Sequence, residues 1–172
     1  YRLEQPIIHS DIKPANIGVR ETGRDNYQYV LMDFDVSTPI TSEGNDSFTS
    51  GLSNKATLKG LTPAYAPPEQ VLAQLNPSAT ISNRVDIYAV GAIAMQMLTG
   101  KAPEKTSNET FYSLPFQALN SNQREIFHLI CHHDATFRPR VIADVLSGRK
   151  KPDGRKFKPE PVSNSKDGNI IN

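Results

Sequence analysis

The sequence is poor in the features that mark secreted or membrane proteins. Its 172 residues include one cysteine, Cys131, so no disulfide can form within the chain, which suits a reducing compartment. The longest apolar run, 85–98, is shorter than the roughly 20 residues that a bilayer crossing needs, and it contains Asp86 and Gln96. No secretory signal pattern is visible. We therefore expect no membrane partner and take the cytoplasm as the default location, with the nucleus as the alternative.

A strong charge of one sign is also absent. Nineteen Lys and Arg face eighteen Asp and Glu, which gives a formal net charge of +1. So small a net charge argues against nucleic acid as a partner attracted by the field of the whole molecule. The hydrophobic fraction of 37% and the charged fraction of 22% are ordinary for a soluble globular chain. The length fits one domain or a large part of one, and the oligomeric state is left open.

The most informative stretch is a polar loop over residues 9–16, which reads His-Ser-Asp-Ile-Lys-Pro-Ala-Asn and lies between apolar runs. It places a carboxylate, an amine and an amide close together, on Asp11, Lys13 and Asn16. Pro14 fixes its own φ and biases the preceding residue away from helix, so the loop is stiff. A stiff loop can hold polar groups toward one point, as charge stabilisation during a reaction requires. On these residues alone, a plain polar turn is the alternative.

Two strand-like runs follow this loop, at 17–20 and 27–32, and the residues between them have turn chemistry. A hairpin brings the residue before its first strand close to the residue after its second, because paired strands lie about 5 Å apart. We therefore expect Asn16 and Asp33 to lie side by side, each offering an oxygen. Oxygen ligands are what Mg²⁺ prefers, so the hairpin predicts a magnesium site.

Together these two motifs resemble the protein kinase family. Residues 9–16 keep the H-x-D-x-K-P-x-N spacing of the family's catalytic loop, and Asp33-Phe34-Asp35 resembles its Asp-Phe-Gly. The Lys-Pro pair inside the loop is the form seen in Ser/Thr kinases rather than in Tyr kinases. The resemblance implies an α+β fold like the C-terminal lobe of a kinase, mainly α-helical with a small β-hairpin near the catalytic loop.

A third stretch resembles the end of the kinase activation segment. Residues 62–69 end in Pro-Pro-Glu where the family usually has Ala-Pro-Glu, so the activation segment corresponds to residues 33–69. The Ser-, Thr- and Gly-rich residues 36–57 read as a long loop, and loops of that length are usually functional or disordered. The alternative is a linker between two separate cores. A short helix is predicted over 69–75.

The run 84–98 is the best helix of the sequence. Apolar residues lie on nearly every face, which predicts a buried helix. Ser82 or Asn83 could cap its start, and Gly100 fits its end. It resembles the central helix of the kinase C-terminal lobe, which implies that Asp86 ties down the backbone of the catalytic loop. The alternative is an exposed carboxylate in the first helical turn, where the helix dipole favours it.

The remaining sequence predicts smaller features. Helices are expected over 121–132 and 141–146, and Arg138, in a match to the family's Asp-Pro-x-x-Arg-Pro, is implied to pair with Glu69. The histidines of this region could suggest a metal site, but no carboxylate or cysteine arrangement completes one; they are His128, His132 and His133. Residues 148–172 read as a polar, partly basic, disordered tail.

The resemblance implies a role for each polar residue of the site. Asp11 would orient a substrate hydroxyl and accept its proton, and Lys13 would neutralise charge on the moving phosphoryl group. Asn16 and Asp33 would hold Mg²⁺ against the phosphates of ATP, which Lys13 would also contact. Thr62 would lie near the substrate hydroxyl, beside Asp11 and Lys13. His9 and Phe34, in contrast, are expected to pack rather than to react.

Three departures from the family pattern bear on activity. Ser10 stands where many kinases have an Arg that receives an activation-segment phosphate, so phosphorylation of residues such as Thr57 is not expected to be the main switch. Asp35 replaces a glycine, and its carboxylate could either bind the metal or repel the phosphates. No Gly-rich phosphate loop and no Val-Ala-x-Lys strand precede the catalytic loop. The N-terminal lobe is therefore absent from the match, which covers the C-terminal lobe alone, over residues 1–147.

The leading interpretation is a Ser/Thr protein kinase that transfers the γ-phosphoryl group of ATP to a Ser or Thr hydroxyl of a protein substrate. We expect the chain to be a fragment of a longer protein and to show no kinase activity alone. The alternative is a pseudokinase, with the same fold used to bind nucleotide or to act as a scaffold. An unrelated soluble domain would require all of these motifs to coincide in the correct order.

Overall fold

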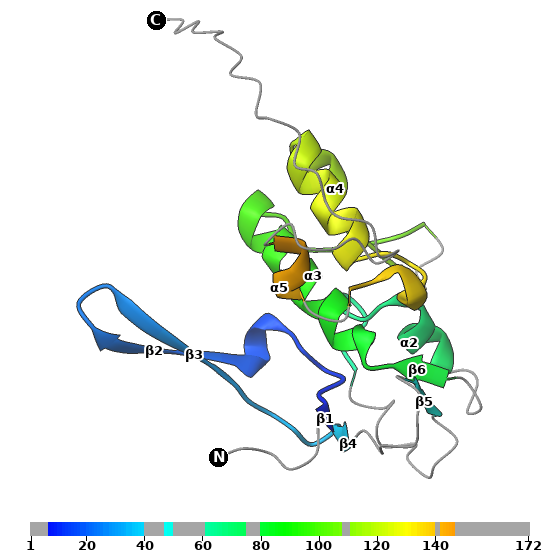
Figure 1. Cartoon of the computed structure of the whole chain (residues 1–172), viewed down its shortest axis with the longest axis horizontal. Coiled ribbons are helices and arrows are strands. Elements are labelled where there is room, and N and C mark those ends of the chain that lie inside the picture. Colours follow the sequence, from blue (N-terminus) through cyan, green and yellow to red (C-terminus); the bar gives the residue numbers. More distant parts are fainter. Residues whose placement is uncertain are drawn as a thin grey trace, which may run out of the picture.

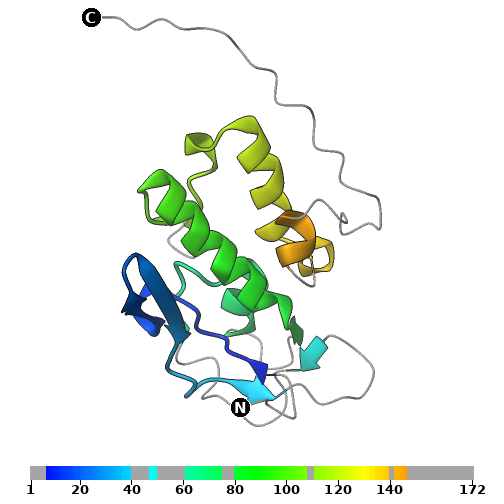
Figure 2. The same ribbon diagram turned by 60° about the vertical axis from the view of Figure 1, so that its left-hand side comes forward.

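The computed structural model describes residues 7–39, 47–49, 61–74, 80–107, 111–139 and 142–146. Its longest element is the helix α3 (Arg84–Thr99), which lies between a projecting hairpin on one side and the helix α4 (Ser121–Ile130) on the other (Figure 1, Figure 2). The Ser82 hydroxyl accepts the first free N–H of α3, from Arg84, at 3.1 Å. The helix ends at Gly100, whose φ of 68° closes it in the left-handed conformation that glycine allows. Both predicted ends of this helix are therefore confirmed.

The helix α3 buries two of its faces against different partners. One row of residues spaced four and three apart, Tyr88, Ala92 and Met95, packs against Phe127 and Ile130 of α4. A second row packs on the polar loop that precedes the hairpin, since Ala89 and Ile93 share a cluster with Ile12. The same helix therefore forms the core and supports the loop.

The third side of α3 is exposed, which corrects the prediction of a helix buried on nearly every face. Val90 is 38% exposed, Leu98 57% and Met97 75%. The apolar pattern read from the sequence is real, but no described element covers this side of the helix.

The helix α4 begins with a capping box. Asn120 Oδ1 accepts the N–H of Gln123 at 2.9 Å, and Gln123 Oε1 accepts the N–H of Asn120 at 3.0 Å. The helix was predicted to reach His132, and it ends two residues earlier, at Ile130. The buried Cys131 follows, and burial raises the pKa of its thiol to about 12. This cysteine is thus a small core residue, as expected.

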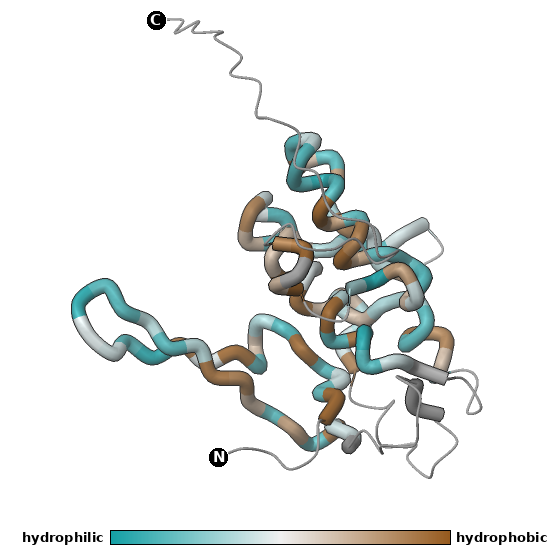
Figure 3. Tube along the Cα trace, viewed as in Figure 1, coloured by the Kyte–Doolittle hydropathy of each residue, from teal (hydrophilic) through white to brown (hydrophobic). Residues whose placement is uncertain are grey.

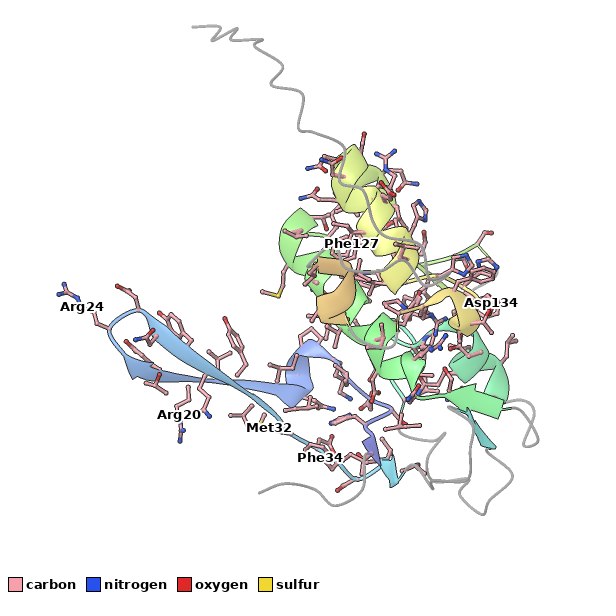
Figure 4. The ribbon with its side chains drawn as sticks, in the orientation of Figure 1. Arg20, Arg24, Met32, Phe34, Phe127 and Asp134 are labelled. Carbon is pink, nitrogen blue, oxygen red and sulfur yellow. The ribbon has the colours of Figure 1, made fainter. Side chains whose placement is uncertain are left out.

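The helices α3 and α4 approach each other closely at one glycine. A Cβ atom added to Gly91 would lie 2.5 Å from both Cys131 Sγ and Ile130 Cγ2. No side chain fits at that distance, so this contact between the two helices requires glycine. Phe127 fills the space between them (Figure 4).

Short elements complete the described part of the chain, and they agree with the α+β class. The remaining helices are α2 (Pro68–Ala73) and α5 (Ile142–Leu146), with the 3₁₀ turns Pro14–Asn16, Phe116–Ala118 and Ala135–Phe137. The strands form antiparallel pairs: β1 (Ile7–Ile8) with β4 (Thr38–Pro39), β5 (Ser47–Thr49) with β6 (Thr80–Ser82), and β7 (Glu104–Lys105) with β8 (Tyr112–Ser113). The predicted helices at 69–75 and 141–146 are therefore present with slightly different ends.

The predicted hairpin is present and projects away from the helices (Figure 1). The strand β2 (Ile17–Gly23) is longer than expected, and β3 (Asn26–Leu31) begins and ends one residue earlier than expected. Ile17 pairs with Leu31 at the base of the hairpin. Every residue from Val19 to Asp35 is exposed. The base of the ribbon is apolar and its tip is polar (Figure 3).

Two predictions concern parts of the chain outside the described residues. They are the loop over 36–57, most of which with Thr57 is not described, and the tail 148–172. Within the described part of the chain, no helix combines the length and the apolar character needed to cross a membrane.

Candidate active site

The loop at residues 9–16 is anchored by Asp86, in the first turn of α3. The backbone N–H groups of His9 and Ser10 donate to Asp86 Oδ2 and Oδ1, at 2.8 and 2.9 Å. Burial raises the pKa of Asp86, and the two N–H donors partly oppose that shift by stabilising the carboxylate. The predicted tie between Asp86 and the loop is confirmed, and the alternative of an exposed, unengaged carboxylate is wrong.

His9 has the contacts of a packing residue. Its side chain is 2% exposed, its Nδ1 accepts the N–H of Asp11 at 3.3 Å, and its Nε2 lies 2.9 Å from Met32 O. One neutral tautomer, with the proton on Nε2, satisfies both contacts. The edge of its ring meets Phe34, with centroids 4.8 Å apart. Phe34 lies near the base of the hairpin, whereas Arg24 points outward at its tip (Figure 4).

The carboxylate of Asp11 is the point on which the polar groups converge. Oδ1 accepts the backbone N–H of Thr62 at 3.0 Å, and Oδ2 accepts from Lys13 Nζ at 2.7 Å and Asn16 Nδ2 at 3.2 Å. Lys13 Nζ also donates to the hydroxyl of Thr62, at 3.0 Å. Of the predicted site residues, Lys13, Asn16 and Thr62 therefore each donate to the carboxylate of Asp11.

The hairpin brings the backbone of Asp33 close to that of Asn16. Met32 N–H donates to Asn16 O at 2.9 Å, so Asn16 lies opposite Met32, and Asp33 follows one residue beyond. The backbone register thus places Asp33 one residue beyond the partner of Asn16, and the meeting of their two side chains stays a prediction. Asp33 is exposed and has a φ of 64°.

The oxygens of Asn16 and Asp33 fit a hard divalent cation. Asn16 Nδ2 donates to Asp11 O at 2.9 Å as well as to Asp11 Oδ2, which leaves the amide Oδ1 as the atom free to meet a cation. An amide oxygen and an exposed carboxylate are donors that suit Mg²⁺, which keeps several water or phosphate oxygens.

Asp35 lies just beyond this donor pair. The residues other than glycine with positive φ in the described chain are Ser10, Asp25 and Asp33. The backbone at position 35 therefore does not need glycine, and the Asp35 carboxylate is exposed without backbone strain there.

The histidines at 128, 132 and 133 stack on neighbouring rings. His128 stacks on Phe116, and His132 stacks on His133, each with ring centroids 4.5 Å apart. Among the described residues, no group of three His, Cys, Asp or Glu side chains is close enough to share a metal ion.

The predicted pair of Arg138 and Glu69 is confirmed. Arg138 is 1% exposed and donates to both carboxylate oxygens of Glu69, at 2.5 and 2.9 Å. Its remaining donors meet the carbonyl of His132 at 2.6 Å and that of His133 at 3.1 Å. The pair fixes the start of α2 to the chain that follows α4.

Sequence reasoning missed one buried polar residue beside the site, Gln70. It is 2% exposed, and its Nε2 donates to the carbonyl of Ser10 at 2.6 Å. The sequence gives one hint of its role: Gln70 is the polar residue among the buried positions of a short helix, and the other buried positions, such as Val71, are apolar. That signal does not reveal the partner, which lies 60 residues earlier.

The arrangement can accept a proton and neutralise an anion. A nearly buried carboxylate is oriented by three donors, one of which is the ammonium group of Lys13. A hydroxyl placed against Asp11 would find a proton acceptor, and an anionic group arriving beside it would find Lys13.

Comparisons with known proteins agree with this chemistry. The family model described as "Protein kinase domain" matches residues 1–144. A probable serine/threonine-protein kinase PknB of Corynebacterium glutamicum is 32% identical over 145 residues, which is 84% of this chain and 20% of that protein. The serine/threonine-protein kinase PknJ of Mycobacterium tuberculosis is 34% identical over 103 residues, 60% of this chain and 15% of that protein.

A plant protein is also similar to this chain. The receptor protein-tyrosine kinase CEPR1 of Arabidopsis thaliana is 35% identical over 101 residues, which is 59% of this chain and 9% of that protein. The chain thus spans a fifth or less of the length of each of these relatives.

Proposed function

The chain belongs to the protein kinase family, and from that premise we propose that it is the catalytic, C-terminal lobe of a Ser/Thr protein kinase. The reaction is transfer of the γ-phosphoryl group of ATP to a Ser or Thr hydroxyl of a protein. The observation that carries the proposal is the convergence of Lys13, Asn16 and Thr62 on the carboxylate of Asp11. Phosphoryl transfer asks a protein mainly for positioning and charge neutralisation, and this cluster supplies both.

Asp11 has the central role. Its carboxylate orients the substrate hydroxyl and takes the hydroxyl proton as the oxygen attacks the γ-phosphorus and ADP leaves. Lys13 neutralises the transferred group, and its bond to the hydroxyl of Thr62 holds the ammonium beside Asp11. The backbone N–H of Thr62 keeps the other carboxylate oxygen in place.

Asn16 and Asp33 are the residues that would hold Mg²⁺. When bound, that ion neutralises charge on the ATP phosphates. The contribution of this chain is to keep the Asn16 amide nitrogen on Asp11, which leaves the amide oxygen available to the ion.

Specificity for Ser and Thr rests on two observations. Lys13 connects Asp11 to Thr62, and the Lys-Pro pair at this position is the Ser/Thr form of the loop. Two of the relatives are named as Ser/Thr kinases and one as a receptor tyrosine kinase. The proposed partners are therefore ATP and a protein with a Ser or Thr acceptor, and the cytoplasm remains the expected location.

The test measures phosphate transfer from labelled ATP to a protein or peptide substrate by the full-length protein. Replacing Asp11 by Asn keeps the shape of the side chain and removes the proton acceptor. We therefore expect the rate of transfer to fall by about 10²- to 10⁴-fold. Asp25→Asn, a change of the same kind at the exposed turn of the hairpin, should leave transfer unchanged.

Two results would contradict the proposal. Equal, background-level transfer by the parent and by Asp11→Asn, with nucleotide still bound, would identify a pseudokinase. Phosphate recovered on Tyr alone would overturn the Ser/Thr assignment. The 172-residue chain by itself is expected to transfer no phosphate.

A further inference from the structure

The residue just before Asp11 is held on both sides of its backbone. The N–H of Ser10 donates to Asp86 Oδ1 at 2.9 Å, and its carbonyl accepts from Gln70 Nε2 at 2.6 Å. Ser10 itself has a φ of 69°, a conformation that L-residues avoid. A residue in that conformation persists only where its surroundings fix it, and here the two flanking side chains do so.

The two side chains that hold Ser10 come from different helices. Asp86 lies in the first turn of α3, and Gln70 lies in α2. The residue before Gln70 is Glu69, which the buried Arg138 binds through both carboxylate oxygens. The ion pair of Glu69, at the end of the 33–69 segment, therefore holds the neighbouring Gln70 in position.

The hydrogen bond from Gln70 to Ser10 is made to the backbone and involves no charged group. The hydroxyl of Ser10 is buried without a hydrogen-bond partner in the structure, so the side chain at position 10 does not contribute to the anchoring. Gln70 donates a neutral amide N–H to a neutral carbonyl. Neither Arg at position 10 nor a phosphate on the 33–69 segment is needed to complete it.

The space around the contact is nearly filled. A cavity of about 10 Å³ lies among Ser10, Gln70 and Asp86, which is room for about one water molecule. The loop therefore has little freedom to move toward α2 while Gln70 is in place.

From these observations we propose that Gln70 is a positioning residue, which fixes the peptide between Ser10 and Asp11 and so aims the Asp11 carboxylate without phosphorylation of the 33–69 segment. The proposal rests on the proposed function for its effect on transfer. Its structural part, the anchoring of the loop by α2, can be measured separately.

The first variant is Gln70→Met in the full-length protein, which keeps the length and volume of the side chain and removes the donor. We expect kcat to fall roughly 10- to 100-fold, since a misplacement of about 1 Å at a reacting group can cost that much. The KM values for ATP and for the substrate should stay within about twofold, and the melting temperature should change little. Leu72→Met, at the exposed position of the same helix, is the matched control and should behave as the parent.

The second variant is Gln70→Glu, which distinguishes the effect of the hydrogen-bond donor from the effect of side-chain volume. An ionised carboxylate facing the Ser10 carbonyl cannot donate, whereas a protonated carboxyl can. The ratio of kcat for Gln70→Glu to kcat for the parent should therefore rise as the pH is lowered. A residue that acts through volume alone would give a ratio independent of pH.

Hydrogen exchange supplies the readout that does not depend on catalysis. In Gln70→Met the backbone amides of residues 9–11 should exchange faster, while those of α3 and of the hairpin stay at parental rates. If the parent proves inactive, the proposed function fails, and this exchange pattern still decides the anchoring. A kcat within twofold of the parent for Gln70→Met, or unchanged exchange at residues 9–11, would overturn the proposal.

Discussion

The 9–16 loop and the β2–β3 hairpin adjoin at Asn16, yet they are held in opposite ways. The backbone and carboxylate of the loop are bound by residues far away in the sequence, Thr62, Gln70 and Asp86, at separations of 51 to 77 residues. The hairpin is held by its own two strands and is exposed from Val19 to Asp35.

The difference separates the two halves of the candidate site. Asp11, which would act on the proton, depends on tertiary contacts that fix its position closely. Asp33, which would meet the cation, is positioned by local strand pairing at the base of an exposed ribbon. Substitutions of one kind should therefore have very different effects in the hairpin and in the packed part of the chain that comprises the loop and the helices around it, and three matched pairs test this.

The largest contrast is expected between two arginines. Arg138→Met removes the buried partner of Glu69 and leaves two backbone carbonyls without their donor, so the free energy of unfolding should fall by about 3–5 kcal/mol. Arg20→Met on the exposed hairpin, where Arg20 bonds to Gln28, should change it by less than about 0.5 kcal/mol. Equilibrium unfolding in urea measures both, and equal losses would break the comparison.

A smaller contrast is expected between two glycines. Gly91→Ala would place a Cβ 2.5 Å from Cys131 Sγ and should destabilise by about 1–3 kcal/mol through overpacking of α3 against α4. In the hairpin, the nearest atom to an added Cβ at Gly18 is Met32 Sδ, at 3.3 Å, near the end of a flexible side chain. Gly18→Ala should therefore be neutral within about 0.5 kcal/mol. Thermal unfolding measures both variants. A larger loss of stability for Gly18→Ala than for Gly91→Ala would show that the hairpin is the more tightly packed region.

The smallest contrast is expected at two residues with positive φ. Ser10→Gly relieves a φ of 69° and removes a buried hydroxyl without a partner, so the protein should gain about 0.5 kcal/mol after the added entropy of the unfolded chain is counted. Asp25→Gly, at a φ of 60° in the hairpin turn, should change stability by less, because Asp tolerates this conformation better than Ser does. Chemical denaturation resolves the difference, and a loss of stability in Ser10→Gly would show that its hydroxyl matters.

Local features of the fold were predictable from the sequence. The hairpin, the helix over residues 84–98 and its glycine terminus follow from patterns within a few residues, because strand alternation, helical periodicity and capping are local interactions. The kinase motifs identified Asp11, Lys13, Asn16 and Asp33 for the same reason, since their spacing within and around one hairpin is short.

Other features depended on which segments meet. The exposure of Met97 on α3 depends on whether another element covers that side, and the apolar pattern alone predicted the wrong answer. Gln70 was missed because its partner, the carbonyl of Ser10, is a backbone group that any residue would present. The backbone N–H of Thr62 also meets Asp11 only when the chain closes a loop of 51 residues.

The sequence by itself determined the chemical groups of this protein and the short elements that carry them. The tertiary structure decided how those groups are aimed, because orientation comes from hydrogen bonds between distant segments and from close packing around them. The sequence specifies each side chain, whereas the direction in which a carboxylate points is set by neighbours that only folding brings together.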